Sequence, residues 1–222
     1  MQKIYFVLGI VIAIITVVSG GIPILLNKKA PPEVSMIEQS LSSKKIVMVI
    51  AFKDFRDEEY FVPKEILEGS GAEIKTASNK EGMARGADGG EVLIDYKLED
   101  IDLNNFDAVV FIGGPGCLEN LDNENSYNLV KETVAKNKLL ASICVSPVIL
   151  AKAGVLKGKR ATVWSGPMDK SAIKILEENG AIYTPESVVV DGKIVTAEGP
   201  AVAGKFTEAL IKNRAFAEQK RR

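Results

Sequence analysis

The sequence predicts an α/β protein in which helices cover both faces of a doubly wound, mainly parallel sheet. Short apolar runs with β-branched residues, suited to buried strands, occur at residues 45–51, 107–112 and 139–143. Helical patterns separate these runs, and strands that alternate with helices are typical of a parallel sheet. The chain has 222 residues, of which 46% are hydrophobic, so one such domain can hold a sizeable core.

Residues 4–26 contain no charged side chain. As a helix this segment would be about 34 Å long, enough to cross a hydrocarbon core of about 30 Å. We therefore expect a single-pass transmembrane anchor, with the membrane as a partner. The alternative is a signal peptide whose charged region is Lys3, but apolar residues continue past the candidate cleavage site at Gly20. The lysine distribution slightly favours a cytoplasmic C-terminal domain.

Three further segments follow this apolar run. Residues 27–43 contain two adjacent prolines and several polar residues, which predicts a linker. The folded domain is expected at residues 44–215, and a basic tail at 216–222.

The elements of the domain are predicted in order from their patterns. The first strand is followed by a helix that begins at Pro63 and ends at nearby glycines. The turn residues Asp88, Gly89 and Gly90 indicate a hairpin or excursion at 86–95. The remaining strands are expected at residues 73–77, 161–164, 187–190 and 193–196, and the remaining helices at 126–136, 147–153, 170–179 and 200–213.

Composition excludes several kinds of function. The chain has no histidine, which rules out Ser-His-Asp and Cys-His catalysis within one chain and leaves no imidazole for zinc. Its two cysteines, Cys117 and Cys144, are too few for a disulfide framework. The net charge of −1 lacks the basic excess of a nucleic-acid surface. We expect no metal, no cofactor and no nucleic-acid partner.

Two predicted strands are followed at their carboxyl ends by residues that could bind or react with a ligand. In open α/β sheets, ligands bind at the carboxyl ends of the strands. After residues 107–112, Gly113 and Gly114 permit a tight turn whose N–H groups could hold an oxyanion, although a plain turn explains the motif alone. The strand at 139–143 stops at Cys144, just before a helix start. Free N–H groups there would lower the thiol's pKa, but a small buried apolar cysteine fits the local pattern equally well.

These motifs, in this order, resemble the DJ-1/PfpI family. Residues 141–147 are similar to the family's cysteine elbow, whose pattern is close to Ala-Ile-Cys-x-Gly-Pro. The family places its active-site glutamate four residues before a proline, which is Glu59 here. The glycine turn and residues 153–158 and 189–196 also match. The resemblance covers residues 45–211 and implies the flavodoxin-like fold of the family.

The sequence departs from the family pattern at several positions. Val145 stands where many members have histidine after the cysteine, and residues 162–165 lack the histidine that others carry on a later strand. Ser146 replaces a usual glycine, and Ser142 a usual alanine. The histidine-dependent activities of the family, peptidase activity among them, are therefore not expected.

The resemblance implies a site in which Cys144 is the nucleophile and Glu59 its proton partner, with backbone N–H groups of Gly113, Gly114 and Val145 holding an oxyanion. Glu59 would keep its proton while Cys144 loses one. Without the resemblance, Glu59 is one acid among several on a solvated helix start. The implied substrate is a small reactive carbonyl, such as a glyoxal-type aldehyde or an early glycation adduct, for a cysteine-dependent hydrolase or lyase.

A redox sensor or stress-response protein, in which Cys144 oxidises to a sulfinic acid, is the non-enzymatic alternative. Cys117 could resolve an oxidised Cys144, or be a buried bystander. A homodimer is compatible with the resemblance.

Overall fold

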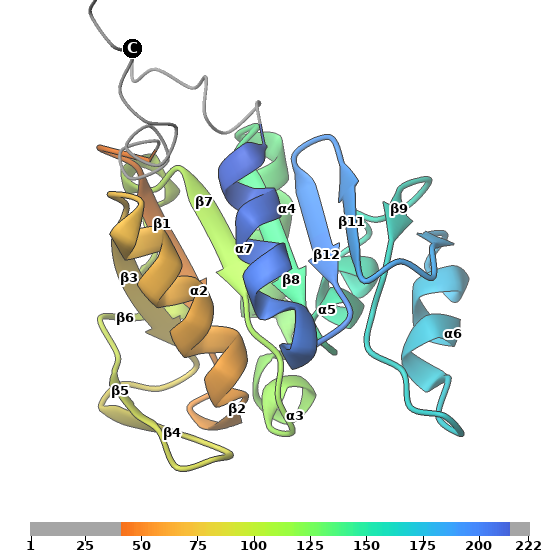
Figure 1. The fold of residues 1–222 in the computed structure, drawn as a ribbon, viewed down its shortest axis with the longest axis horizontal. Helices are drawn as coiled ribbons and strands as arrows, with labels where there is room; N and C mark the ends of the chain where they lie inside the picture. The colour runs from red at the N-terminus through yellow and green to blue at the C-terminus, as the bar shows by residue number, and fades with distance from the viewer. Residues whose placement is uncertain (1–40, 214–222) are drawn as a thin grey trace, which may run out of the picture. The chain divides into compact units, whose positions relative to one another are not determined.

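A seven-stranded sheet forms the centre of the fold in the computed structural model, which describes residues 41–213 (Figure 1). Every strand runs parallel to its neighbours except the edge strand β11, which pairs antiparallel with β12. In spatial order the strands are β11 (Val188–Asp191), β12 (Ile194–Ala197), β8 (Leu139–Ile143), β7 (Ala108–Phe111), β1 (Lys45–Val49), β3 (Glu73–Ser78) and β6 (Tyr96–Lys97).

Helices cover both faces of this sheet, as the sequence predicted. Helices α2 (Asp57–Gly69) and α7 (Ala203–Lys212) lie side by side on the face towards the viewer in Figure 1. Helices α4 (Glu124–Ala135) and α5 (Pro147–Lys152) pack on the opposite face. Every residue of β7 and β8 is buried, which explains why these strands read as continuous apolar runs.

Smaller elements surround the sheet. The predicted hairpin is confirmed as β4 (Met83–Gly86) and β5 (Glu91–Leu93), which pair antiparallel. Strand β2 (Lys53–Phe55) pairs with β4. The other elements are α3 (Cys117–Leu121), β9 (Arg160–Ala161), β10 (Ile182–Tyr183), α6 (Ser171–Glu178) and the 3₁₀ turns Leu98–Asp100, Leu103–Asn105 and Pro200–Val202.

Helix α2 begins six residues earlier than predicted. Its first turn contains Asp57, Glu58 and Glu59, acids that interact favourably with the positive end of a helix, and Pro63 lies inside the helix. The prediction was wrong here because it took Pro63 as the start of the helix. The correction places Glu59 in a helical first turn, which fixes the direction of its side chain.

The strand expected at residues 161–164 is also shorter. Beyond Ala161 the backbone N–H groups form hydrogen bonds outside a strand ladder. The N–H of Thr162 donates to Oγ1 of Thr196 at 2.9 Å, and the N–H of Trp164 donates to the carbonyl of Cys144 at 2.8 Å. These bonds hold Trp164 beside the end of β8.

The membrane part of the predicted fold is corrected. Within residues 41–213, no helix has the length and apolar character needed to cross a membrane. The segment 4–26, on which that prediction rested, lies outside the described residues, as does the tail at 216–222. The membrane anchor, the membrane as a partner and the single-pass localisation are therefore withdrawn. Of the predicted linker, residues 41–43 are described, and Leu41 among them is fully buried.

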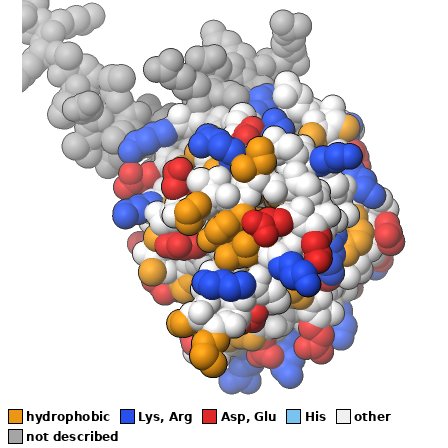
Figure 2. Space-filling view, turned by 90° about the vertical axis from the view of Figure 1, so that its right-hand side faces the viewer, with side chains coloured by type: hydrophobic (Ala, Val, Ile, Leu, Met, Phe, Trp, Pro, Cys, Tyr) orange, Lys and Arg blue, Asp and Glu red, His pale blue; other side chains and the backbone are white. Residues whose placement is uncertain are grey.

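The β11 edge of the sheet is protected by charged side chains. Figure 2 shows the side of the molecule on which α6 lies in Figure 1, where hydrophobic side chains gather near the middle among side chains of both charges. Arg160 donates from Nη2 to the carbonyl of Val190 at 3.1 Å, and Lys159 pairs with Asp191 at 3.1 Å. Edge strands covered in this way are poor templates for unwanted strand pairing.

Gly116 tests the packing of α3 against β2. A Cβ at this position would clash with the carbonyl oxygen of Lys53, so Gly116→Ala should lower the free energy of unfolding by about 3 kcal/mol. Gly204 in α7 is the matched control, because a Cβ there meets nothing within 4 Å. Gly204→Ala should raise stability by up to about 1 kcal/mol. Urea unfolding of both variants measures this; equal effects would contradict the close approach.

Candidate active site

The register of the sheet places the carboxyl ends of β7 and β8 side by side, and these are the two strand ends at which the sequence predicted functional residues. Phe111 of β7 lies opposite Ser142 of β8, so the parallel strands, continued by two residues, bring Gly113 next to Cys144. A Cβ built on Gly113 would lie 2.5 Å from the Cβ of Cys144 and 2.8 Å from Oε2 of Glu59. Only glycine leaves room for the thiol and the acid to meet.

Cys144 occupies a strained turn between β8 and α5. Its φ of 65° lies in the left-handed region, which costs a non-glycine residue about 1–3 kcal/mol. Two bonds hold this conformation: the N–H of Cys144 donates to the carbonyl of Ala197 at 2.9 Å, and its carbonyl accepts from Trp164. Residues with such strain cluster at functional sites, which favours a functional role over that of a packed structural cysteine.

Ser146, a departure from the family pattern, fastens the same turn. Its fully buried hydroxyl lies 2.7 Å from the carbonyl of Ile143 and 3.0 Å from that of Phe111, and accepts from the N–H of Ile143 at 3.1 Å. The second unusual serine, Ser142, lies 2.9 Å from the same hydroxyl. The two serines therefore tie the end of β8 to β7 and keep the elbow in place.

Glu59 is fully buried, so its interpretation as a solvated acid on a helix start is wrong. Oε2 accepts from the N–H of Gly113 at 3.0 Å, while Oε1 has no hydrogen-bond partner of good geometry in the described part of the chain. Burial raises the pKa of Glu59 to about 7, although interactions with Cys144, Gly113 and Arg56 oppose this. A buried carboxylate with an unpaired oxygen is costly, so near neutral pH the group readily takes a proton.

Burial also raises the pKa of the Cys144 thiol, to about 12, and the negative charge of Glu59 adds to this effect. The N–H groups of Gly114 and Val145 face the sulfur and lower the pKa, as the sequence led us to expect, but their effect is smaller. The expectation of a lowered thiol pKa is therefore wrong for the resting pair. Between about pH 7 and about pH 12 the thiol and the acid together hold one proton.

The backbone donors divide into two groups. The N–H of Gly113 is already bonded to Glu59, while those of Gly114 and Val145 are directed at the sulfur. Gly114 has a φ of 113°, and a Cβ there would clash with the backbone nitrogen of Arg56. The N–H groups of Gly114 and Val145 thus face the sulfur, whereas that of Gly113 orients the acid.

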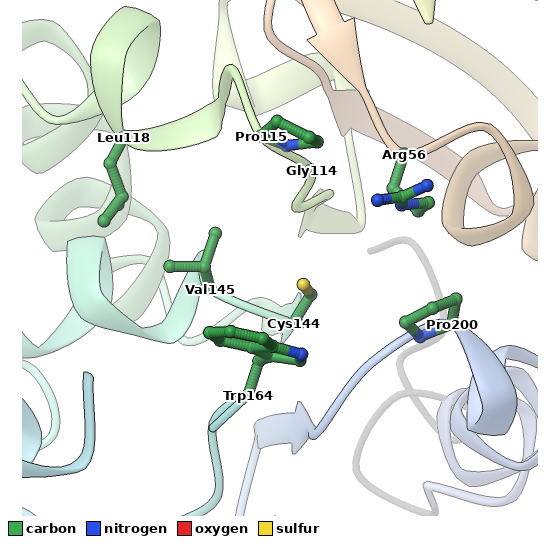
Figure 3. Close-up of a pocket in the computed structure, with 8 residues that line it drawn as sticks. All are labelled: Arg56, Gly114, Pro115, Leu118, Cys144, Val145, Trp164 and Pro200. Carbon is green, nitrogen blue, oxygen red and sulfur yellow. The ribbon is translucent and has the colours of Figure 1, made fainter. Parts of the chain in front are cut away.

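A cavity of about 320 Å³ opens above Cys144. Figure 3 shows the sulfur at its centre, directed towards Gly114 and Pro115. The lining residues are Arg56, Gly114, Pro115, Leu118, Cys144, Val145, Trp164 and Pro200. The sequence interpretation missed Arg56, Leu118, Trp164 and Pro200 as cavity residues. Arg56 stands three residues before Glu59 in the matching motif, and Trp164 is the only tryptophan of the chain, so both could have been considered.

Cys117 is fully buried at the start of α3, and burial raises the pKa of its thiol well above the usual value. Both cysteines are free thiols. A thiol so shielded is a weak nucleophile, which favours a packing role over that of a resolving cysteine.

Comparison with known proteins identifies the family. The family model described as DJ-1/PfpI matches residues 44–213. The chain belongs to the DJ-1/PfpI family. An uncharacterized protein of Methanocaldococcus jannaschii is 41% identical over 175 residues, which are 78% of this chain and 84% of that protein. A protein of Pyrococcus abyssi named a deglycase is 33% identical over 166 residues, 75% of this chain and 97% of its own length.

Two other DJ-1/PfpI relatives extend the comparison. A glutathione-independent glyoxalase of Caenorhabditis elegans is 25% identical over 170 residues, 77% of this chain and 88% of that protein. The crystal structure of a ThiJ/PfpI domain protein from Brachyspira murdochii superposes with a TM-score of 0.71 at 34% identity, covering 77% of this chain and 95% of that one. The predicted flavodoxin-like DJ-1/PfpI fold is confirmed.

The raised pKa of Glu59 makes stability depend on pH. Because the folded protein binds this proton more tightly than the unfolded chain, whose value is 4.5, stability should fall as pH rises from about 4.5 to about 7. The loss amounts to about 3 kcal/mol at most. Glu59→Gln should remove this dependence and be the more stable protein at pH 8.

Urea unfolding at pH 5 and pH 8 measures the effect, and the absence of histidine keeps this window free of imidazole titration. Glu65, which is exposed on the same helix, supplies the control, since Glu65→Gln should keep the wild-type dependence. Wild-type stability that rises between these pH values, with Glu59→Gln unchanged from wild type, would contradict a buried acid.

Proposed function

We propose that this chain acts on small reactive carbonyl compounds, 2-oxoaldehydes or early glycation adducts, with Cys144 as the nucleophile and Glu59 as the proton carrier. One observation carries the proposal: a strained cysteine interacts with a buried acid whose pKa is about 7, at the floor of a small cavity. An acid with this pKa can both take and give a proton near neutral pH. The names of the deglycase and glyoxalase relatives support the same class of substrate.

The first step would form a bond between Sγ of Cys144 and the aldehyde carbon. The thiol proton passes to Glu59 and from there to the carbonyl oxygen, which gives a hemithioacetal. This route needs no thiolate at rest, so the high pKa of Cys144 does not prevent it, because Glu59 removes the proton as sulfur attacks. The N–H groups of Gly114 and Val145 stabilise the negative charge that develops.

The second step would move hydrogen within the substrate. Glu59 takes the proton from the former aldehyde carbon and returns it to the neighbouring ketone carbon, while the hydroxyl proton of the hemithioacetal moves to the ketone oxygen. The first carbon thereby becomes a thioester and the ketone an alcohol. Water then cleaves the thioester, which frees the thiol and releases a 2-hydroxy acid. The net reaction adds one water to the 2-oxoaldehyde. One carbon is oxidised and its neighbour reduced, so no external oxidant is required.

A redox sensor is the second candidate, because two N–H groups already face the sulfur and would also bind the oxygens of a sulfinate. It would use the same residues without turnover. A homodimer stays a prediction.

Turnover of methylglyoxal tests the proposal. The full-length chain should convert methylglyoxal to lactate, and Cys144→Ser should reduce the rate at least 100-fold. Cys117→Ala is the matched control and should keep most of the rate, since that thiol is sealed in the core. Lactate formation over many equivalents per chain supports an enzyme. Loss of methylglyoxal limited to one equivalent, with no lactate, would contradict the proposal and favour the sensor.

The proton-carrier role of Glu59 predicts a particular pH profile. The value of kcat/KM should rise with pH through about 7, as Glu59 loses its proton and becomes able to accept that of the thiol. Glu59→Gln should lower the rate about 10²–10⁴-fold and abolish this rise. Steady-state kinetics between pH 5 and pH 8.5 measure the profile, with Glu65→Gln on the exposed side of the same helix as control. A rise that persists in Glu59→Gln would assign the titration to another group.

A further inference from the structure

The cavity above Cys144 has a cationic side. Arg56 supplies the only charged side chain among its eight lining residues, and apart from the thiol the others are glycine or apolar. In Figure 3, Arg56 lies on one side of Cys144, while Leu118 and Val145 lie on the other. A ligand over the sulfur would therefore have an apolar wall at one end and a positive charge at the other.

The guanidinium group is held in place from outside the cavity. Nη1 of Arg56 donates to Asp88 at 3.1 and 3.4 Å. Asp88 lies in the β4–β5 turn, which is fastened to α2 because the carboxylate of Asp57 accepts from the N–H groups of Asp88 at 2.8 Å and Gly90 at 2.6 Å. The long side chain of Arg56 is thus positioned before any ligand arrives, which reduces the entropy lost on binding.

Arg56 retains capacity to bind. Asp88 engages Nη1 alone, so within residues 41–213 Nε and Nη2 have no hydrogen-bond partner. The side chain is only 32% exposed, whereas that of Asp88 is 59% exposed and is not part of the cavity lining. The planar fork of a guanidinium matches a carboxylate, which it can bind through two parallel hydrogen bonds.

We propose that the site selects 2-oxoaldehydes that carry a carboxylate, with the carboxylate on Arg56 and the aldehyde carbon at Cys144. This inference rests on the proposed function and names its substrate class. An example is 4,5-dioxopentanoate, a five-carbon acid. The reaction adds one water to give 2-hydroxyglutarate: the aldehyde carbon is oxidised to a carboxylate, and the neighbouring ketone is reduced to an alcohol.

The kinetic test compares 4,5-dioxopentanoate with neutral methylglyoxal. The ratio of their kcat/KM values should favour the acid in the wild-type protein and fall at least tenfold in Arg56→Gln. The ratio is the right measure because the charge of Arg56 also acts on Glu59, and that effect applies to both substrates. Arg85→Gln removes the same charge from an exposed position on β4 and should keep the ratio. Arg56→Lys, which keeps the charge without the fork, should be intermediate.

A binding measurement separates this inference from the proposed function. The probe is 4-oxopentanoate, which keeps the carboxylate and the ketone but has no aldehyde to react, and Trp164 in the cavity reports its binding by fluorescence. If both substrates turn over, an unchanged ratio in Arg56→Gln overturns the inference. If neither turns over, the proposed function fails. Binding of 4-oxopentanoate that weakens at least tenfold in Arg56→Gln then still supports an anion subsite, and unchanged binding overturns it.

Discussion

The close approach of two strand ends is the constraint on which the rest of the site depends. β7 and β8 run parallel in a register that brings Gly113 against Cys144, and the space that a side chain on Gly113 would take is filled by the thiol and by the carboxyl group of Glu59. Glycine is therefore required for packing as well as for the turn. The N–H of Gly113 then orients the acid, so one residue without a side chain both leaves room for the thiol and the carboxyl group and orients the carboxyl group.

The proton chemistry of the site follows from burial. In many active sites a histidine exchanges protons near neutral pH. This chain has none, and a glutamate reaches the same range because water is excluded from it. This arrangement lowers the stability of the folded protein. Only the ionised form of Glu59 can accept the proton of the thiol, and burial disfavours that form. Activity and stability therefore make opposite demands on one carboxyl group.

Much of this architecture could be read from the sequence. The buried strands produce apolar runs that no loop would tolerate, and the order of strands and helices leaves few topologies. The pairing of Glu59 with Cys144 could come only from the family resemblance, because the two residues are 85 positions apart in the numbering. They meet because the first turn of α2 lies against Gly113, at the end of β7. Burial of Glu59 and its effect on the thiol depend on three-dimensional packing, which no local pattern encodes.

The cavity combines tightly packed residues around Cys144 with rim residues that have more freedom to be substituted. Cys144 lines the cavity, and Gly113 and Glu59 pack against it with no room for a further side chain, so substitutions at these three positions disturb the pair itself. The rim of the cavity comes from unrelated segments, with Leu118 from α3, Trp164 from the loop after β9 and Arg56 from the entry to α2. Leu118 and Trp164 carry no charge that acts on Glu59, whereas Arg56 does, so a change at Arg56 also affects the acid. Under the proposed function, a descendant of this protein could thus acquire a different substrate through single substitutions of Leu118 or Trp164 while it keeps the same pair of reacting groups.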